Sequence, residues 1–407
     1  MRTSAFWEIP PTAGMPAQLH DLLPPWRGNF SQQAAAFLHV PSSGVECSGS
    51  ASLMVILSAL KTLSSRRTVI IPAYTCPLVV FAVMQCGLNA RLCDLASESF
   101  EFDPTALIAA CDDETLAIIP THLAGRVAQL DDVVTIARKH GAYVIEDAAQ
   151  AFGALQNGAS VGLSGDAAFF SFALGKGLSL YEGGLWIAHN PVLLAAIEHV
   201  SADLIPFRWS IEILRWIQLL GYATLYRPLP LRFIYGMPLR QALRQHDPIA
   251  AVGDRFSSNI PLHRVGLWRR SAGISALLRL ADFQTALRRQ AAKRLPLLKQ
   301  LSGVHVFDDA AGANGVWPSF LLLMPTQAAR DAVLSRLWGS GMGVTRMFAH
   351  ALPDYDNLRP ILTQTDVPNA RDFAARSFTI SNSLWMDDFR FSQILIVLRE
   401  SLELAIS

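Results

Sequence analysis

The sequence has little charge, few cysteines and no long uninterrupted apolar run, and each shortage excludes a class of protein. Charged residues make up 16% of the chain against 51% hydrophobic residues, and the net charge is +1. Neither binding to nucleic acid through a basic surface nor widespread disorder is expected from this balance. No stretch of about 18 uncharged apolar residues occurs, so we expect no helix that spans a membrane.

Cysteine is also scarce, and its positions exclude two kinds of site. The five cysteines all lie in the first third of the chain, and they are Cys47, Cys76, Cys86, Cys93 and Cys111. Their number is odd and none forms a Cys-x-x-Cys pair, which favours free thiols over a disulfide framework or a zinc site. The N-terminus lacks the continuous apolar segment of a signal peptide. We therefore expect a cytoplasmic enzyme.

What the sequence does contain, from residue 47 to residue 190, is a regular alternation of strand and helix patterns. This alternation predicts a parallel or mostly parallel sheet with helices on both faces. Ligands bind at the carboxyl ends of the strands in such sheets. The segments that follow the predicted strands, and so mark the candidate site, are 74–76, 121–125, 146–150 and 171–176.

Two of these segments carry residues with a shared chemistry. Asp147 ends one predicted strand, and Lys176 follows the next strand-like run, "AAFFSF". A lysine that binds a cofactor covalently and an aspartate that keeps a pyridine nitrogen protonated are what pyridoxal phosphate requires. The segment "CSGSAS" enters a helix, so Gly49, Ser50 and Ala51 can present backbone amides to a phosphate, and Ser171 offers a hydroxyl.

These motifs resemble those of the DegT/DnrJ/EryC1/StrS family of sugar aminotransferases, which are fold-type I pyridoxal phosphate enzymes. The similarity extends over roughly residues 30 to 405 and is strongest from 45 to 190. The matching segments, in chain order, are "SGSASL", "VIIPAYTC", "IIPTHLAGRVAQLDDV", "HGAYVIEDAAQAFGA", "VGLSGDAAFFSF" and "GKGLSLYEGG", followed more faintly by "RLADFQTALRRQAAKRL" and "GVTRMFAHALPDY".

The resemblance implies a role for each matching residue. Lys176 corresponds to the Schiff-base lysine, Asp147 to the partner of the pyridine nitrogen, and Gln150 to a glutamine near the cofactor's 3-hydroxyl group. The residues that it places at the phosphate are Gly49, Ser50, Ala51 and Ser171. His122 matches a common family histidine that either packs near the ring or is structural. Arg346 and His350 match positions where the smaller domain faces the substrate.

Two positions depart from the family pattern. The aromatic residue that stacks on the cofactor is replaced by Cys76, so either Tyr74 stacks instead or the ring packs against the thiol. An asparagine that reaches the neighbouring subunit's phosphate is replaced by Leu277, two residues before Arg279. This replacement puts the contact between subunits in doubt.

Residues 205–245 are a further departure, since they resemble an insertion. The segment is aromatic and apolar and contains six arginines against one glutamate. Aromatic, basic segments of this kind can lie in a membrane interface. The alternative is an additional helical hairpin that packs on a dimer or over the site.

The sequence therefore predicts an α/β fold-type I enzyme, in which the resemblance implies a seven-stranded, mostly parallel sheet and a homodimer. The predicted divisions are an N-terminal lead-in (1–30), a large domain (31–265) and a linking helix with a small α/β domain (266–407). The predicted reaction moves an amino group from an amino acid, with glutamate as the expected donor, to a nucleotide-linked keto-sugar. The alternatives are a dehydratase, in which a histidine would replace Lys176, and a non-catalytic or membrane-recruited member.

Overall fold

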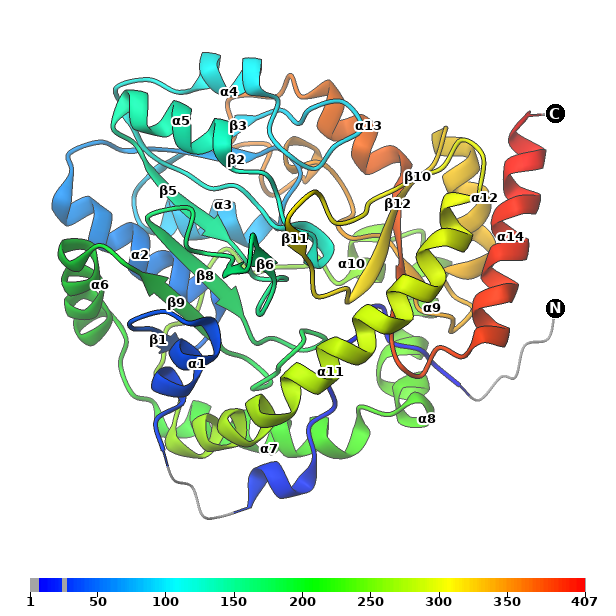
Figure 1. Cartoon of the computed structure of the whole chain (residues 1–407), viewed down its shortest axis with the longest axis horizontal. Coiled ribbons are helices and arrows are strands. Elements are labelled where there is room, and N and C mark those ends of the chain that lie inside the picture. Colours follow the sequence, from blue (N-terminus) through cyan, green and yellow to red (C-terminus); the bar gives the residue numbers. More distant parts are fainter. Residues whose placement is uncertain (1–6, 24–27, 407) are drawn as a thin grey trace.

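A seven-stranded sheet forms the centre of the larger domain in the computed structural model, which describes residues 7–23 and 28–406 (Figure 1). The strands, in their order across the sheet, are β1 (Gly44–Glu46), β9 (Gly184–Ala188), β8 (Ala167–Ser171), β5 (Tyr143–Asp147), β4 (Thr115–Ile118), β2 (Thr68–Pro72) and β3 (Asn89–Cys93). All neighbours from β3 to β8 pair in parallel, whereas β9 is antiparallel to both β8 and β1. The predicted mostly parallel sheet is confirmed.

Helices cover both faces of this sheet because its strands are apolar on both sides. In β2, Val69 and Ile71 pack into one cluster of buried side chains, and Ile70 packs into another on the opposite face. The first face is covered by α2 (Gly49–Leu63), α3 (Pro77–Gln85) and α6 (Pro191–Leu204). The other face is covered by α4 (Pro104–Ala110) and α5 (Asp131–His140), and further along by α1 (Phe30–Leu38).

Local signals in the sequence set the ends of these helices. Asp103 caps α4 by accepting a hydrogen bond from the Ala106 amide at 2.8 Å, and Pro104 occupies the first helical position. Gly141 ends α5 in a left-handed conformation with φ of 63°, which glycine adopts without strain.

A smaller domain, built on an antiparallel sheet, follows a long helix, α11 (Leu267–Lys299). The sheet order is β10 (His305–Val306), β12 (Ser319–Leu323), β14 (Ser377–Ser381) and β13 (Val344–Thr345). Its helices are α12 (Gln327–Leu337), α13 (Pro368–Arg376) and α14 (Asp388–Ile406). Figure 1 shows α11 running diagonally past the large domain toward α12 and α14.

Short elements connect these layers. A three-stranded sheet pairs β11 (Ala313–Asn314) from the smaller domain with β6 (Leu155–Gln156) and β7 (Ala159–Ser160) from the larger one. Three 3₁₀ turns complete the connections: η1 (Leu19–Leu22), η2 (Leu123–Gly125) and η4 (Leu352–Asp354).

Residues 7–18 of the predicted lead-in link the two domains, and we call them the N-terminal strap. Residues 1–6 and 24–27 of the predicted lead-in lie outside the described residues. The Ile9 amide donates to the Gly341 carbonyl at 2.8 Å, and the Ala13 amide donates to the Pro318 carbonyl at 2.9 Å. The Met15 amide donates to the carbonyl of Gly177 in the large domain, at 3.2 Å. The strap has no helix but is bonded to both domains.

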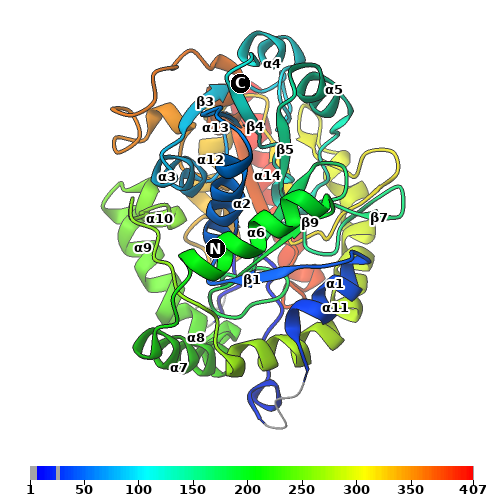
Figure 2. The ribbon, with the colours of Figure 1, turned by 90° about the vertical axis from the view of Figure 1, so that its left-hand side faces the viewer.

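The segment that resembles an insertion is helical. It contains α7 (Trp209–Leu225), α8 (Pro228–Leu231), a π-helical segment η3 (Arg232–Gly236) and α9 (Met237–Arg244), followed by α10 (Pro248–Val252). Figures 1 and 2 show α7 and α8 on the outside of the molecule, with α7 next to α11. Leu219, Tyr222 and Leu231 pack against the strap and α11. Within the described part of the chain, the helices fall short of the length and apolarity needed to span a membrane.

Candidate active site

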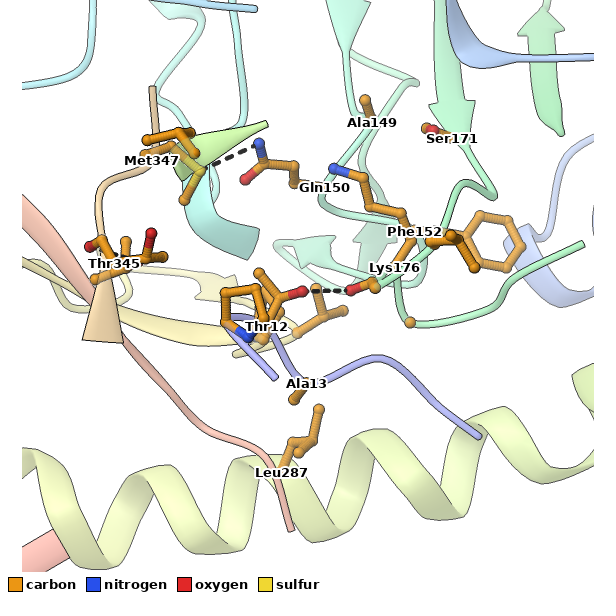
Figure 3. Close-up of a pocket in the computed structure, with 18 of the residues that line it drawn as sticks. Thr12, Ala13, Ala149, Gln150, Phe152, Ser171, Lys176, Leu287, Thr345 and Met347 are labelled. Atoms are coloured by element: carbon orange, nitrogen blue, oxygen red, sulfur yellow. Dashed lines mark hydrogen bonds between the residues drawn. The ribbon is translucent and has the colours of Figure 1, made fainter. Parts of the chain in front are cut away.

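Lys176 and Asp147 lie together at the carboxyl edge of the large sheet. Asp147 is the last residue of β5, and Lys176 lies in the loop of residues 172–183 between β8 and β9, which we call the lysine loop. Because β5 and β8 are adjacent and parallel, their ends meet at one edge. A cavity of about 200 Å³, which we call the lysine cavity, is lined by Lys176, Gln150 and Ser171. Figure 3 shows the Lys176 side chain extending toward Gln150.

Burial determines the charge state of both residues. It raises the pKa of the Asp147 carboxyl to about 6, against the opposing effects of a hydrogen bond from the Ala149 amide at 3.1 Å and of the Lys176 charge. Burial lowers the pKa of the Lys176 amine, against the effects of Cys76 and Asp147. The site therefore favours a neutral amine, and its carboxylate lacks a close cationic partner among the described residues.

The predicted phosphate-binding residues meet where α2 begins. Gly49 lies so close to Ser171 that a Cβ atom at residue 49 would be 3.1 Å from the Ser171 Cβ atom. Ser48 caps the helix by accepting a hydrogen bond from the Ala51 amide at 3.0 Å. The Ala51 amide is thus already bonded, whereas the amides of Gly49 and Ser50 lie in the first turn, where a helix leaves its amides unpaired. This arrangement suits an anion beside Ser171.

Gln150 is held at the opposite side of the lysine cavity by two contacts. Its Oε1 atom accepts a hydrogen bond from the Ala124 amide at 2.8 Å, and its Nε2 atom donates to the Met347 sulfur at 3.5 Å (Figure 3). These contacts join the large domain to the smaller one through a single side chain.

The structure places Tyr74 differently from the stacking role considered for it. Its side chain is 1% exposed and packs edge-to-face against Phe348 and Phe373, with ring centroids 5.5 and 5.1 Å away. Its hydroxyl accepts a hydrogen bond from the Phe348 amide at 3.2 Å. These contacts hold the ring in the core, so it does not line the lysine cavity.

Cys76, the other candidate, precedes the first turn of α3 and lies within electrostatic range of Lys176 and Asp147. Burial raises the pKa of its thiol to about 12. The thiol is therefore protonated at neutral pH and acts as a small apolar group rather than as a nucleophile.

His122 has a structural role, because it forms hydrogen bonds beside the strand that ends at Asp147. Its Nδ1 atom accepts a hydrogen bond from the Ala128 amide at 3.0 Å, so its Nε2 atom is free to donate to Glu146, also at 3.0 Å. Glu146 accepts further bonds from the Gly162 and Gly165 amides at 2.6 Å each. Of the two roles considered for His122, this geometry favours the structural one.

Residues from the smaller domain also line the lysine cavity. Arg346 donates one hydrogen bond to the Ala374 carbonyl at 3.0 Å, and its buried Nε atom has no hydrogen-bond partner in the described structure. Its guanidinium is thus available to an anionic ligand. His350, the other predicted residue, is not among the residues that line the cavity.

The strap contributes part of the lysine cavity that the sequence did not predict. Pro11, Thr12 and Ala13 line it, and the Thr12 hydroxyl donates to the Gly175 carbonyl at 2.7 Å (Figure 3). The only sequence signal here is a Pro-rich run, "IPPTAG", which is typical of a loop of any function.

The second departure from the family pattern is explained by contacts within the chain. Leu277 is buried in the core beneath α1, and Arg279 forms an ion pair with the buried carboxylate of Asp21. Arg279 is therefore engaged by its own chain.

The far end of the lysine loop is held by buried charges. Glu182 forms an ion pair with Arg215 of α7 at 2.5 Å, and its carbonyl accepts a hydrogen bond from Arg269 of α11. Arg269 also pairs with Glu212 of α7, which accepts from the Gly266 amide at 2.6 Å. The lysine loop is thus fixed to the helices of the 205–245 segment.

Comparison with known proteins finds a family match over the part of the chain that contains Asp147 and Lys176. Residues 25–203 match the DegT/DnrJ/EryC1/StrS aminotransferase family. Protein MosB of Rhizobium meliloti is 38% identical over 146 residues, which are 36% of this chain and 29% of that protein. An L-glutamine:2-deoxy-scyllo-inosose aminotransferase of Streptomyces kanamyceticus is 35% identical over 187 residues, 44% of this chain and 43% of that protein. The matches span less than half the length of these curated relatives.

Solved structures support the fold over nearly the whole chain. A putative sugar aminotransferase, Spr1654 of Streptococcus pneumoniae in its PLP form, superimposes with a TM-score of 0.74 at 17% identity. That alignment covers 98% of this chain and 100% of the other. DesI, crystallised in the presence of its TDP-sugar product, gives a TM-score of 0.75 at 18% identity, over 98% of this chain and 95% of that one. The predicted fold class is confirmed.

Proposed function

Because residues 25–203 match the DegT/DnrJ/EryC1/StrS aminotransferase family, as the motifs predicted, we propose that this protein is a pyridoxal phosphate-dependent aminotransferase. Its amino donor in this proposal is an amino acid, with glutamate first, and its acceptor is a keto-sugar, with nucleotide-linked sugars first. The observation that carries the proposal is that a half-buried Lys176 and a buried Asp147 lie at one sheet edge, beside the first turn of α2.

The described residues fit this cofactor. Asp147 is a buried carboxylate with a single hydrogen bond and a raised pKa, so a cationic ring nitrogen would supply the partner that it lacks. Ser171 and the amides of Gly49 and Ser50 would hold the phosphate, and Gln150 would lie near the ring. When bound, the cofactor withdraws electrons from the donor's Cα atom and so makes its proton acidic.

Lys176 is suited to move that proton. Burial lowers the pKa of its amine, so the neutral form that accepts a proton is more populated than in a lysine exposed to solvent. The lysine loop holds the amine in place, because the Gly175 and Gly177 carbonyls are bonded to the strap. Arg346, with its unpartnered Nε atom, would bind the carboxylate of the amino donor.

The keto-sugar acceptor rests on the printed names of relatives. Besides the aminotransferase of S. kanamyceticus, these include a GDP-perosamine synthase of Vibrio cholerae, 28% identical over 165 residues (40% of this chain, 45% of that protein). Lys176 favours transamination over the dehydratase alternative, in which a histidine stands at this position. A homodimer and a cytoplasmic location form part of the proposal.

Absorbance spectroscopy tests the proposal directly. The purified protein loaded with pyridoxal phosphate should absorb at about 420 nm and shift to about 330 nm when glutamate is added. Lys176→Ala should lack both the first band and the shift, whereas Lys139→Ala, on the exposed surface of α5, should retain them. A protein that fails to bind pyridoxal phosphate would refute the aminotransferase function. A bound cofactor that ignores glutamate would point to another donor or to the dehydratase.

A further inference from the structure

A second cavity, of about 550 Å³, lies beside the lysine cavity. We call it the tyrosine cavity, because Tyr181, Tyr222, Tyr226 and Tyr235 line it. The rest of its wall comes from α7, α8 and η3, from the strap and from the lysine loop. The two cavities share wall residues, Pro11, Thr12, Leu174, Gly175 and Tyr235. The tyrosine cavity is therefore adjacent to the cavity that contains Lys176.

The polar groups of the tyrosine cavity are mostly engaged within the protein. The Tyr222 hydroxyl donates to the Met15 carbonyl at 3.0 Å, and the Tyr226 hydroxyl donates to the Thr12 carbonyl at 3.3 Å. The Thr12 hydroxyl is bonded to Gly175, and the Gln218 side chain accepts from Arg215 at 2.8 Å. Most of the wall is apolar, so a sugar or a nucleotide in this cavity would lose hydrogen bonds to water that the Tyr181 and Tyr235 hydroxyls can replace only in small part. An apolar chain forms no hydrogen bonds with water, so it loses none when it enters the cavity.

The opening of the tyrosine cavity is also apolar, and its surroundings are basic. Leu225 and Ile234, which line it, are 43% and 52% exposed. The only acidic residue between positions 205 and 245 is Glu212, which is buried and paired with Arg269. Arg227 and Arg232 directly follow the lining residues Tyr226 and Leu231 in the chain, so basic residues adjoin the wall of the cavity. These features suit an apolar chain that is joined to its carrier through an anionic group such as a phosphate.

We propose that the acceptor sugar carries an alkyl or isoprenyl chain, and that the tyrosine cavity binds this chain while the sugar reaches Lys176. This inference rests on the proposed aminotransferase function and narrows its acceptor class. The insertion-like segment then has a specific purpose, since α7, α8 and η3 supply most of the apolar wall.

A series of alkyl phosphates tests the chain-binding cavity without knowledge of the natural acceptor. Ethyl, butyl, hexyl and octyl phosphate are titrated by calorimetry into the protein loaded with pyridoxal phosphate. If the chain enters the cavity, affinity should rise by roughly three- to fourfold for each added methylene group. Equal affinity for ethyl and octyl phosphate would overturn the proposal.

Gly221→Leu is the variant that blocks the cavity. Gly221 lines it on α7, and a Cβ atom there would meet no heavy atom within 4 Å, so the new side chain can enter the empty space. Octyl phosphate should bind at least tenfold more weakly, and the dependence on chain length should flatten. Thr224→Leu is the matched control, because it adds the same side chain at an exposed position of the same helix. Circular dichroism and the melting temperature establish that both variants are folded.

The outcomes separate this inference from the proposed function. Octyl phosphate binding that Gly221→Leu leaves unchanged, or that Thr224→Leu weakens equally, would place the chain on the outer surface of α7 and overturn the inference. Chain-length-dependent binding that only Gly221→Leu weakens supports the inference. The response of the wild-type protein to glutamate tests the aminotransferase function separately, because glutamate carries no apolar chain.

Discussion

The lysine cavity and the tyrosine cavity share a wall but differ in what their linings demand. The lysine cavity is lined by Lys176, whose pKa is lowered, and by Arg346, which has an unpartnered nitrogen, and Asp147 with a raised pKa lies at the same sheet edge. The tyrosine cavity is mainly apolar, and the hydroxyl groups of Tyr222 and Tyr226 in its wall are bonded to the strap. Burying the incompletely paired charges of the lysine cavity lowers the stability of the fold when no ligand is bound. The bonded hydroxyl groups of the tyrosine cavity lower it little. A catalytic site can therefore be recognised from buried charges that lack full partners, whereas a binding site for an apolar group can be recognised only from the shape of its cavity.

The largest effect should come from removing the amine of the lysine cavity. Lys176→Ala should slow the reaction with glutamate by at least about 10²–10⁴-fold, because the base that moves the Cα proton is lost. Single-turnover absorbance measurements would give the rate, with Lys139→Ala as the control. A rate within tenfold of wild type would show that Lys176 is not the base. The proposed difference in chemistry between the two cavities would then be wrong.

A second prediction concerns Glu212 and Arg269, the ion pair that holds the far end of the lysine loop at Glu182. Burial opposes ionisation of Glu212, but bonds from His263 and Arg269 outweigh it and lower its pKa to about 2. A carboxyl with a lowered pKa stabilises the fold above its unfolded value of 4.5 and loses that effect as the pH falls toward 2. Glu212→Gln should therefore lower the free energy of unfolding by roughly 3 kcal/mol at pH 7.

Urea unfolding at pH 7 and at pH 3 measures this effect. The difference between Glu212→Gln and wild type should shrink at the lower pH, because Glu212 binds a proton in the unfolded chain at pH 3 while it stays mostly ionised in the folded protein. Glu198→Gln, at an exposed position of α6, is the matched control and should change little. Identical unfolding curves for Glu212→Gln and wild type would show that the ion pair of Glu212 with Arg269 does not stabilise the fold.

A third prediction concerns Asp147 and the pH. In the protein without cofactor its pKa is about 6, and a cationic ring nitrogen would lower it. Binding then releases a proton below pH 6, so affinity for pyridoxal phosphate should fall by up to about tenfold per pH unit there through this group. Asp147→Asn should bind roughly ten- to a hundredfold more weakly above pH 6 and lack this contribution.

Equilibrium titrations from pH 5 to pH 8 would compare the two proteins. The cofactor's own ionisations affect both alike, so the difference between the two pH profiles isolates Asp147. A constant difference across the range would contradict the assignment of Asp147 as the partner of the ring nitrogen.

The smallest effect should come from the hydrogen bond between uncharged Thr12 and Gly175, in the wall that the two cavities share. Thr12→Val keeps the shape of the side chain but removes the hydrogen bond to the Gly175 carbonyl, which is worth about 1 kcal/mol. We expect a fall of up to about tenfold in kcat/KM through a less well held lysine loop. Thr285→Val is the control, since its hydroxyl bonds only within α11. Unchanged kinetics would show that the strap lines the cavity without positioning Lys176.

The sequence predicted those parts of the molecule whose causes are local. The strands that end at Asp147 and Ser171 are apolar runs, which can be recognised from the local sequence alone. Lys176 was found because it follows such a strand. Its neighbour Thr12 was not found, because their contact joins residues that are far apart in the chain.

Tyr74 illustrates the same limit. Its position after β2 placed it near the cofactor, but Phe348 and Phe373 of the smaller domain draw its ring into the core. Nothing in the segment around Tyr74 carries information about those rings. The tyrosine cavity was likewise beyond prediction, because the apolar residues of α7 indicate a buried or membrane-lying helix equally well.

The strap has a consequence for how the chain assembles. Its first residues bond to Pro228 and Gly341, and its middle bonds to Pro318. These partners are synthesised long after the strap, so the strap can dock fully only after Gly341 has been made. Closure of such distant contacts slows folding. Until the strap docks, Lys176 lies in a loop that lacks its support, so the lysine cavity takes its final shape late in folding.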